Sequence, residues 1–506
     1  MSSPAVELVE ITKSFGRLRA NDRVSLRVDA GSIHAIVGEN GAGKTTLMNI
    51  LFGLYQPDAG RILLDGRAVR LHSPADALRR GLGMVHQHFM LVRPFTVAEN
   101  IVLAQEMTRG PFLDRARALR EVHALCERFG LHVDPEARVE DLSVGEEQRV
   151  EILKALYHGA RTLILDEPTA VLTPQETEEL FAVLRALRAQ GSTVILITHK
   201  LREVMEISDR VTVMRAGRVV AELATAATSI PELAERMVGR RVLLEVAKGP
   251  AEPGATVLEI AGLEVKDDRG LPGVRNLSLT VRAGEIVGLA GVEGNGQAEL
   301  VEAVTGLRAA GAGTIRLTGT ELRGLTPRAI ADLGVAHVPA DRLKRGLVPD
   351  FPLEDNLIFG CHHRAPFTRG LLLDRAAIHS FAERMLEAYD VRPRAPRAPA
   401  RRLSGGNQQK LIVAREFTRE AKLLIAAHPT RGIDLGAIEF LHREIVRQRD
   451  AGRAVLLVSA DLGELLSLAD RICVLYEGRV VHEAVPAATD ERELGLYMTG
   501  KQRAAG

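Results

Sequence analysis

The strongest constraint on the fold is a long internal repeat. Ala30-Gly31-Ser32-Ile33 recurs 253 residues later as Ala283-Gly284-Glu285-Ile286, and Leu142-Ser143 recurs 261 residues later as Leu403-Ser404. An offset that changes by only eight residues predicts two copies of one domain, with one short insertion in the second copy. We place the first domain at residues 1–241 and the second at 257–506. Residues 242–256, rich in Gly, Pro and Ala, are predicted to link them.

Within each copy, short apolar runs alternate with helix-like segments. Residues 32–37, 163–165 and 194–197 have the composition and length of buried strands. Residues 44–52 have the apolar spacing of a helix, with Leu47, Ile50 and Leu51 on one side. This alternation predicts an α/β fold whose sheet is mainly parallel.

A glycine-rich segment lies between the first of these strands and the helix. Residues 38–45 fit the pattern G-x-x-x-x-G-K-[ST], and the strand–loop–helix context favours a phosphate-binding loop. Backbone N–H groups would surround phosphate oxygens, Lys44 would neutralise the β- and γ-phosphates, and the Thr45 hydroxyl would coordinate Mg²⁺. The predicted nucleotide-binding residues of this loop are Gly38, Glu39, Asn40, Gly41, Ala42, Gly43, Lys44, Thr45 and Thr46.

A second apolar strand ends in two acids, Asp166 and Glu167. A buried strand seldom ends in paired carboxylates unless a cation shares them. Following a phosphate loop, Asp166 is predicted to belong to the Mg²⁺ shell and Glu167 to act as the base that polarises the attacking water.

These motifs together resemble the ABC ATPase family over essentially the whole chain. Residues 142–148 (Leu-Ser-Val-Gly-Glu-Glu-Gln) and 403–409 (Leu-Ser-Gly-Gly-Asn-Gln-Gln) look like its signature motif. The resemblance implies two tandem ATPase domains, each with a parallel core, a helical subdomain and a small antiparallel β part. It also implies that Gln87 contacts Mg²⁺ or water, that His199 contacts the γ-phosphate, and that Phe15 stacks on adenine.

The second copy has lost the residues expected to perform the chemistry. At the places of Lys44, Thr45, Gln87, Asp166, Glu167 and His199 stand, in order, Gln297, Ala298, Ala340, Ala427, His428 and Ala460, and Phe15 falls opposite Asp268. The second copy has the fuller signature motif, however, and has Asp434 where the first has Thr173. In the family, ATP lies between the phosphate loop of one half and the signature of the other. The resemblance therefore implies that Ser404, Gly405, Gly406 and Gln408 complete the site of Lys44, leaving one active and one silent site.

Bulk composition limits the partners and the compartment. Lys plus Arg (66) nearly equals Asp plus Glu (65), which gives no argument for a nucleic-acid partner. The three cysteines, Cys126, Cys361 and Cys473, lie far apart, so neither disulfides nor structural zinc are expected. No apolar run approaches the ~20 residues of a membrane span, and no signal peptide is seen at the N-terminus. A membrane role would therefore require docking to a partner.

The resemblance is closest to ATPases of bacterial importers for nucleosides, with simple-sugar importers as the alternative. It implies two integral-membrane permeases, an extracytoplasmic solute-binding protein and a location on the cytoplasmic face of the membrane. The segment around Gln87, with Phe89 to Asn100, is predicted to dock a permease. A soluble ABC ATPase acting on ribosomes or DNA is the alternative from another class. A ribosomal protein of this class is expected to have two intact sites and a long charged linker. A DNA-acting one is expected to have zinc-binding cysteines or a basic face.

Overall fold

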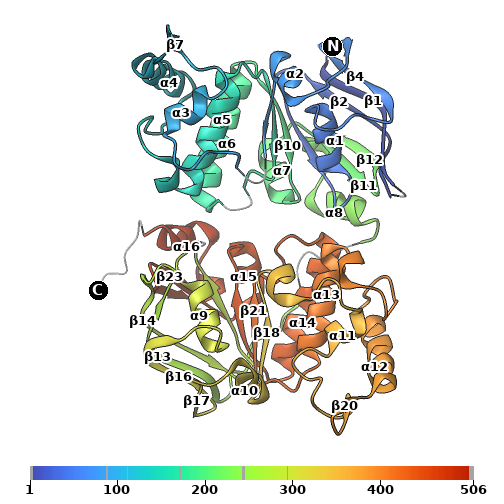
Figure 1. Cartoon of the computed structure of the whole chain (residues 1–506), viewed down its shortest axis with the longest axis vertical. Helices are drawn as coiled ribbons and strands as arrows, with labels where there is room; N and C mark the ends of the chain where they lie inside the picture. Colours follow the sequence, from blue (N-terminus) through green and yellow to red (C-terminus); the bar gives the residue numbers. More distant parts are fainter. Residues whose placement is uncertain are drawn as a thin grey trace. The chain divides into compact units, whose positions relative to one another are not determined.

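The computed structural model of the chain describes residues 4–16, 18–86, 89–110, 112–169, 172–241, 246–292 and 294–500. It divides into two compact units, with the division between residues 242 and 243. Each unit has one six-stranded sheet and one four-stranded antiparallel sheet, and corresponding strands follow one another in the same order along the chain (Figure 1). The predicted α/β architecture with a mainly parallel core is confirmed.

The core of the first unit is a six-stranded sheet in the order β12-β11-β3-β10-β9-β6. All of its neighbouring strands are parallel except the β11–β12 pair. Three central strands are buried along their whole length, which is why they read as continuous apolar runs. The six strands are β3 Ile33–Val37, β6 Leu82–Val85, β9 Thr162–Asp166, β10 Thr193–Ile197, β11 Arg210–Arg215 and β12 Arg218–Ala224.

Successive residues of the central strands face opposite sides, so two cores form. Leu163 and Leu165 pack in the core shared with the helical part, whereas Ile164 packs with the antiparallel sheet. The helical core involves α3 Val97–Val102, α4 Arg115–Phe129, α5 Val144–Tyr157 and α6 Pro174–Ala189. The other core involves α1 Lys44–Leu51, α2 Pro74–Arg79 and the sheet β2-β1-β4-β5, namely β1 Pro4–Phe15, β2 Leu18–Asp29, β4 Ala59–Leu64 and β5 Arg67–Val69.

The remaining elements of the first unit are short. A hairpin of β7 Thr108–Arg109 and β8 Phe112–Leu113 precedes α4, and the 3-10 turn η1 Val139–Asp141 precedes α5. The unit ends with α7 Leu201–Ile207, the turn η2 Thr225–Ala227 and α8 Ile230–Val238.

The second unit repeats this plan. Its main sheet has the order β18-β21-β22-β15-β23-β24, and its antiparallel sheet the order β14-β13-β16-β17. The strands are β13 Thr256–Lys266, β14 Pro272–Arg282, β15 Ile286–Ala290, β16 Ala310–Leu317, β17 Thr320–Glu321, β18 Val335–Val338, β19 Thr368–Arg369, β20 Leu372–Leu373, β21 Leu423–Ala427, β22 Ala454–Val458, β23 Arg471–Tyr476 and β24 Arg479–Ala484. The helices are α9 Gln297–Val304, α10 Pro327–Asp332, α11 Leu353–Leu357, α12 Arg375–Ala388, α13 Gly405–Phe417, α14 Leu435–Asp450, α15 Leu462–Leu468 and α16 Glu491–Met498, with short turns η3 Arg342–Gly346, η4 Ala400–Arg402 and η5 Pro486–Ala488.

The prediction of one insertion in the second copy is wrong, because the extra residues enter at three places. Asn100 and Asn356, 256 residues apart, make matching hydrogen bonds to Val92 and Val348. The N-caps Asp114 and Asp374 are 260 residues apart, and the N-caps Ser143 and Ser404 are 261 apart. Relative to the starting offset of 253, three residues therefore enter between β18 and Val348, four before α12 and one after it.

Residues 246–256, predicted to be part of a linker, are held by the second unit. Lys248 Nζ donates to the carbonyls of Leu468 and Ala469 at 3.0 and 2.6 Å and pairs with Asp470 at 3.0 Å. Arg449 Nη2 donates to the carbonyl of Gly249 at 3.1 Å. Hydrogen bonds over such sequence distances fix this stretch against the unit, although its composition alone resembles a flexible connection.

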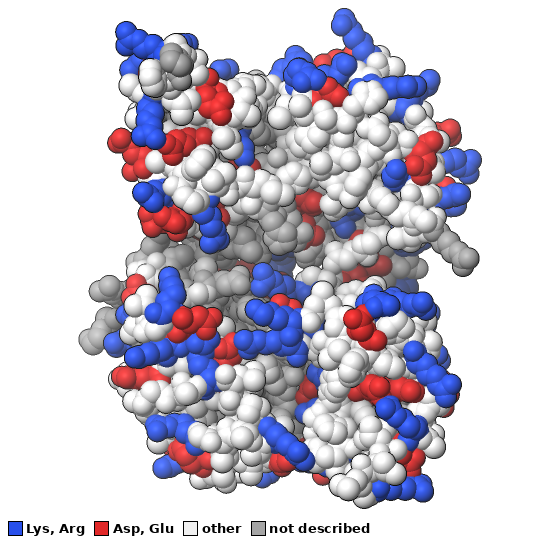
Figure 2. Space-filling model, viewed as in Figure 1, with Lys and Arg blue, Asp and Glu red and all other residues white. Residues whose placement is uncertain are grey.

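Charge is mixed over the surface visible in Figure 2, and the cysteines are not bonded to one another. On the face shown in Figure 2, basic and acidic side chains are interspersed over each unit. All three cysteines are free thiols. In the described part of the chain, no helix has both the length and the apolar character to cross a membrane. Likewise, no three or more His, Cys, Asp or Glu side chains among the described residues are placed to hold a metal ion by themselves.

Candidate nucleotide-binding site

The glycine-rich loop of the first unit joins β3 to α1, as predicted. Gly43 is the N-cap of α1 and has φ +96°, a conformation that side chains with a Cβ rarely adopt. A Cβ on Gly43 would also collide with the carbonyl oxygen of Ala20. The loop therefore needs glycine here in order to turn tightly, and it leaves the first N–H groups of α1 available to an anion.

Lys44 is buried beneath this loop. Its Nζ donates to the carbonyls of Gly38 at 2.6 Å and Glu39 at 3.0 Å. Burial lowers the pKa of Lys44, and the charges of Glu167 and Asp166 oppose that shift. The Lys44 ammonium group is thus bound by two carbonyl groups of the loop and interacts with two nearby carboxylates. If a phosphate enters the loop, its oxygens can replace those carbonyls as hydrogen-bond acceptors.

Asp166, at the end of β9, is buried next to the start of α1 and hydrogen-bonds with the side chain of Thr45. Burial raises the pKa of Asp166 and the charge of Glu167 raises it further, against the effects of Thr45 and Lys44. The surroundings of Asp166 disfavour its ionised form, which a bound cation would stabilise. Its carboxylate and the Thr45 hydroxyl are the kind of oxygen ligands that Mg²⁺ prefers. These two side chains therefore fit a magnesium ion bound with a nucleotide.

Glu167 follows β9 with φ +49°, a conformation that costs free energy for a residue other than glycine. Its backbone N–H donates to the carbonyl of Ile197 at 2.9 Å, and its Oε1 lies 2.9 Å from Nδ1 of His199. Burial would raise the pKa of Glu167, but the hydrogen bond and charge of His199, with Lys44 and Lys200, lower it below the ordinary value. The structure thus brings the predicted base and the predicted γ-phosphate contact together as one pair.

Phe15 lies at the end of β1 with 44% of its surface exposed. Tyr55 meets it edge to face, with 5.3 Å between the ring centroids. In the second unit the places of Phe15 and Tyr55 are taken by Asp268 and Arg308, which form an ion pair at 2.6 Å. An aromatic pair has been replaced by a salt bridge, so the second unit offers no stacking surface at this position.

The other equivalents in the second unit are equally unsuited to phosphate. Gln297 is buried and its Nε2 donates to the carbonyl of Val292 at 3.1 Å, within its own loop. Ala427 ends β21 where Asp166 ends β9, and His428 has φ +45° like Glu167. The backbone shape is retained, whereas the cation, the hydroxyl and the carboxylates have been lost.

The two signature motifs differ in what surrounds their serines. Ser143 caps α5, and its Oγ donates to the carboxylate of Glu146 at 2.8 Å. Ser404 caps α13, and its Oγ accepts from Nδ2 of Asn407 at 2.9 Å. Thr173 caps α6 and Asp434 caps α14, the helices that follow β9 and β21, so this pair of residues serves the same structural purpose in each unit.

Charge around the signature motifs is reversed between the units. Exposed Glu140 and Asp141 of η1 lead into α5, and Glu146 and Glu147 lie in its first turn. The residues at these four places in the second unit are, in order, Arg401, Arg402, Asn407 and Gln408. Four acids are therefore replaced by two bases and two amides. The sequence analysis did not identify this charge difference. It is visible in the sequence when residues 261 positions apart are compared on either side of each signature motif.

Gln87, predicted to contact Mg²⁺ or water, lies outside the described residues, and Ser404, Gly405, Gly406 and Gln408 lie in the second unit. In the predicted docking segment, Met90 is 62% and Phe95 39% exposed, whereas Leu91 packs against the helical core. The Met90 N–H donates to Glu151 Oε1 at 2.6 Å, and Asn100 holds the segment through both atoms of its amide. Hydrogen bonds therefore hold the backbone at Met90 and Val92, and within residues 89–100 the side chains of Met90 and Phe95 are exposed.

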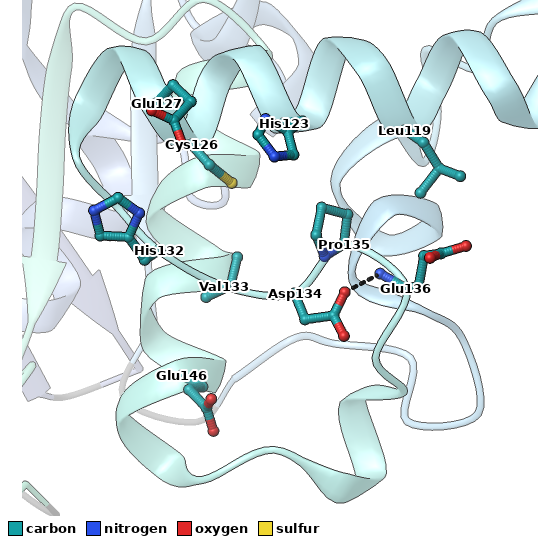
Figure 3. Close-up of a pocket in the computed structure, with 10 residues that line it drawn as sticks. All are labelled: Leu119, His123, Cys126, Glu127, His132, Val133, Asp134, Pro135, Glu136 and Glu146. Atoms are coloured by element: carbon teal, nitrogen blue, oxygen red, sulfur yellow. Dashed lines mark hydrogen bonds between the residues drawn. The ribbon is translucent and has the colours of Figure 1, made fainter.

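An open pocket lies away from the phosphate loop, in the helical part of the first unit. Figure 3 shows it between α4, α5 and the chain that joins them, with His123 and Cys126 from α4 and Glu146 from α5. The other residues that line it are Leu119, Glu127, His132, Val133, Asp134, Pro135 and Glu136. Its histidines and acids are spread around the rim in Figure 3, so they do not form a ligand cluster.

Comparison with known proteins agrees with this geometry. The sequence matches the ABC transporter family twice, over residues 21–170 and 274–431. It is 52% identical over 502 residues to the guanosine import ATP-binding protein NupO of Bacillus subtilis, covering 99% of this chain and 98% of that one. It is 47% identical to the nucleoside import ATP-binding protein NupA of Lactococcus lactis, over 98% of both chains. It is 41% identical to a ribose import ATP-binding protein, RbsA 1, of Rubrobacter xylanophilus, over 99% of this chain and 100% of that one. The chain therefore belongs to the ABC transporter family, and it contains the family's ATP-binding domain in two tandem copies.

Proposed function

We propose that the chain is the ATP-hydrolysing subunit of a bacterial ABC importer that takes up nucleosides. The relatives NupO and NupA, whose names specify guanosine and nucleoside import, support this cargo. The partners would be two integral-membrane permeases and an extracytoplasmic solute-binding protein, with the chain on the cytoplasmic face of the membrane. Simple sugars are the second candidate cargo, favoured by the similarity to a ribose import protein.

The residues of the first unit divide the work of hydrolysis. Phe15 would stack on adenine, and the loop from Gly38 to Thr46 with Lys44 would hold the phosphates. Thr45 and Asp166, with Gln87, would hold Mg²⁺, which neutralises charge that develops on the phosphate oxygens. Glu167 would orient the attacking water and accept its proton, and His199 would fix Glu167 and contact the γ-phosphate.

The charge reversal at the signature motifs carries the proposal that the second unit's motif completes this site. A triphosphate brought to Ser143 would meet Glu140, Asp141, Glu146 and Glu147. Like charges ~4 Å apart repel by about 1 kcal/mol even in water, and more where water is excluded. At Ser404 the same approach meets amides and arginines. We therefore assign Ser404, Gly405, Gly406 and Gln408 to the nucleotide held by Lys44, and no chemistry to the loop of Gln297.

A crossed substitution tests this assignment. Ser404→Ala removes a hydrogen-bond donor to developing phosphate charge, and loss of one such donor costs ~10²-fold in turnover. Ser143→Ala should keep a substantial part of the activity, although Ser143 belongs to the unit with the intact phosphate loop. Steady-state ATP hydrolysis by the assembled transporter measures both variants. Greater damage from Ser143→Ala would mean that the assignment is wrong.

The cargo is tested by uptake. Cells that express the chain with its permeases and binding protein are given radiolabelled guanosine or ribose, and Lys44→Ala provides the inactive control. Guanosine uptake that disappears with Lys44→Ala supports the nucleoside proposal. Lys44-dependent uptake of ribose without guanosine would favour the sugar importer, and uptake of neither would contradict both cargoes.

A further inference from the structure

Three extra residues enter the second unit between β18 and Val348. This stretch contains the five-residue π-helical turn η3 Arg342–Gly346, which follows shortly after Ala340, the residue at the place of Gln87. Asp341 caps this turn by accepting from the N–H groups of Leu343 and Lys344 at 3.0 and 2.9 Å. A π-helical turn of this kind is rare in proteins.

The first residue of this turn is Arg342. Its Nη1 donates to the carbonyl of Arg431 at 2.7 Å, and its Nη2 donates to the carbonyl of Gly432 at 3.3 Å. The same Nη2 lies 3.4 Å from the position that a Cβ on Gly405 would occupy. Arg342 thus lies where η3, the first residue of α13 and the loop before α14 meet, next to Ser404.

Two glycines lie at this junction, one in a tight position and one with a left-handed backbone conformation. A Cβ on Gly405 would lie 3.3 Å from the carbonyl oxygen of Gly432, already a tight contact, and Gly432 itself has φ +66°. The residues 261 positions earlier are Val144 and Val171, of which Val171 lies outside the described residues. The first copy therefore has a valine in place of each glycine, and it has no arginine between Val85 and Val92. All three members of the junction differ together.

We propose that Arg342 is a positioning residue for ATP hydrolysis, which fixes the signature motif of the second unit against the loop at Arg431 and Gly432. This proposal rests on the proposed function, because it assigns the signature motif of the second unit to the nucleotide. The guanidinium forms a planar fork that donates to two successive carbonyls at once, which a lysine ammonium cannot reproduce with the same geometry. With the fork in place, Ser404 and the backbone of Gly405 and Gly406 keep one arrangement relative to that loop.

A purely space-filling explanation of Arg342 is weaker. Burial lowers the pKa of Arg342, so the protein places a charge where desolvation disfavours it. The charge also lies beside the N-terminus of the 13-residue helix α13, the positive end of its dipole. A neutral side chain of similar length would fill the same space without either cost. The hydrogen bonds to the two carbonyls offset those costs.

The test uses the full chain assembled with its permeases and compares Arg342→Ala, Arg342→Gln and Arg342→Lys with the control Lys344→Ala. Lys344 is an exposed residue of the same turn. We expect Arg342→Ala and Arg342→Gln to lower kcat by about 10-fold, and Arg342→Lys to lower it by less, since a lysine can still make one bond. The dissociation constant for a non-hydrolysable ATP analogue should change by less than about 3-fold, because Phe15 and Lys44 are untouched. Lys344→Ala should behave as wild type.

Gly405→Val supplies an independent check by introducing the residue of the first unit. It should displace the guanidinium and reproduce the kcat defect, and adding Arg342→Ala should then cost little more, since both changes act on one junction. Wild-type kcat in Arg342→Ala or Arg342→Gln would overturn the proposal, as would an equal loss of analogue binding and kcat. Ser404→Ala in the same assay distinguishes failure of the Arg342 proposal from failure of the proposed function. If it is inactive while the Arg342 variants are active, only the role of Arg342 fails; if it is also active, the proposed function fails too.

Discussion

Removal of His199 should move the pH dependence of hydrolysis in a direction that the structure fixes. Burial raises the pKa of Glu167, and the hydrogen bond and charge of His199 are the largest of the effects that lower it. His199→Ala leaves burial in place and removes the 2.9 Å hydrogen bond. A hydrogen bond to a charged group contributes about 1.5–3 kcal/mol. Its loss disfavours the ionised carboxylate, so the pKa of Glu167 should rise in His199→Ala.

The assay is kcat for ATP hydrolysis measured from pH 4.5 to pH 9. The base must be ionised, so activity falls as pH drops through the pKa of Glu167, and the acid limb should lie at higher pH in His199→Ala than in wild type. The kcat of His199→Ala should also fall at every pH, but the pH at which the acid limb lies does not depend on the absolute value of kcat. Glu167→Gln, with no carboxylate, should lose about 10²-fold or more and show no such limb. An acid limb at the same pH in wild type and His199→Ala would refute the coupling of these two side chains.

Two further predictions concern surfaces. Phe15→Ala should weaken ATP binding by about three- to tenfold, the range for one aromatic stacking contact, whereas Asp268→Ala at the equivalent place should leave it unchanged in an equilibrium nucleotide-binding assay. Single cysteines at the exposed positions of Met90 and Phe95 should crosslink to a permease in the assembled transporter, whereas a cysteine at buried Ile101 should not. Crosslinks from none of these positions in an active complex would contradict docking through this segment.

The sequence predicted those parts of the fold that depend on local patterns. The glycine-rich loop, its flanking strand and helix, and the acids at the end of β9 follow from residue types at short spacing, and the structure has these elements where expected. In the sequence, the correspondence of Phe15 with Asp268 rests on the 253-residue offset alone. The structure adds that their partners, Tyr55 and Arg308, are also 253 residues apart, so an aromatic contact in one unit is replaced by an ion pair in the other.

Other features depend on contacts between residues far apart in the chain, which no local pattern encodes. Lys248 is fixed by Asp470, more than 200 residues away, so a stretch with the composition of a linker becomes part of a unit. From sequence the three insertions are counted as one, because comparing the glycine-rich loops and then the signature motifs of the two copies shows only the total of eight extra residues. Arg342 escaped notice for the same reason, since its role depends on carbonyls some 90 residues later that lie beside the signature motif.

The central claim is that each chain has one chemically complete nucleotide site, and binding stoichiometry tests it most directly. MgATP is titrated calorimetrically into the Glu167→Gln chain, which should bind but hardly hydrolyse the nucleotide, with Glu167→Gln/Lys44→Ala as the control. One ATP per chain, abolished or greatly weakened by the loss of Lys44, is the predicted result. Two ATP molecules bound per chain with comparable affinity would contradict the claim, because Gln297, Ala298 and the Asp268–Arg308 pair would then have to form a second working site.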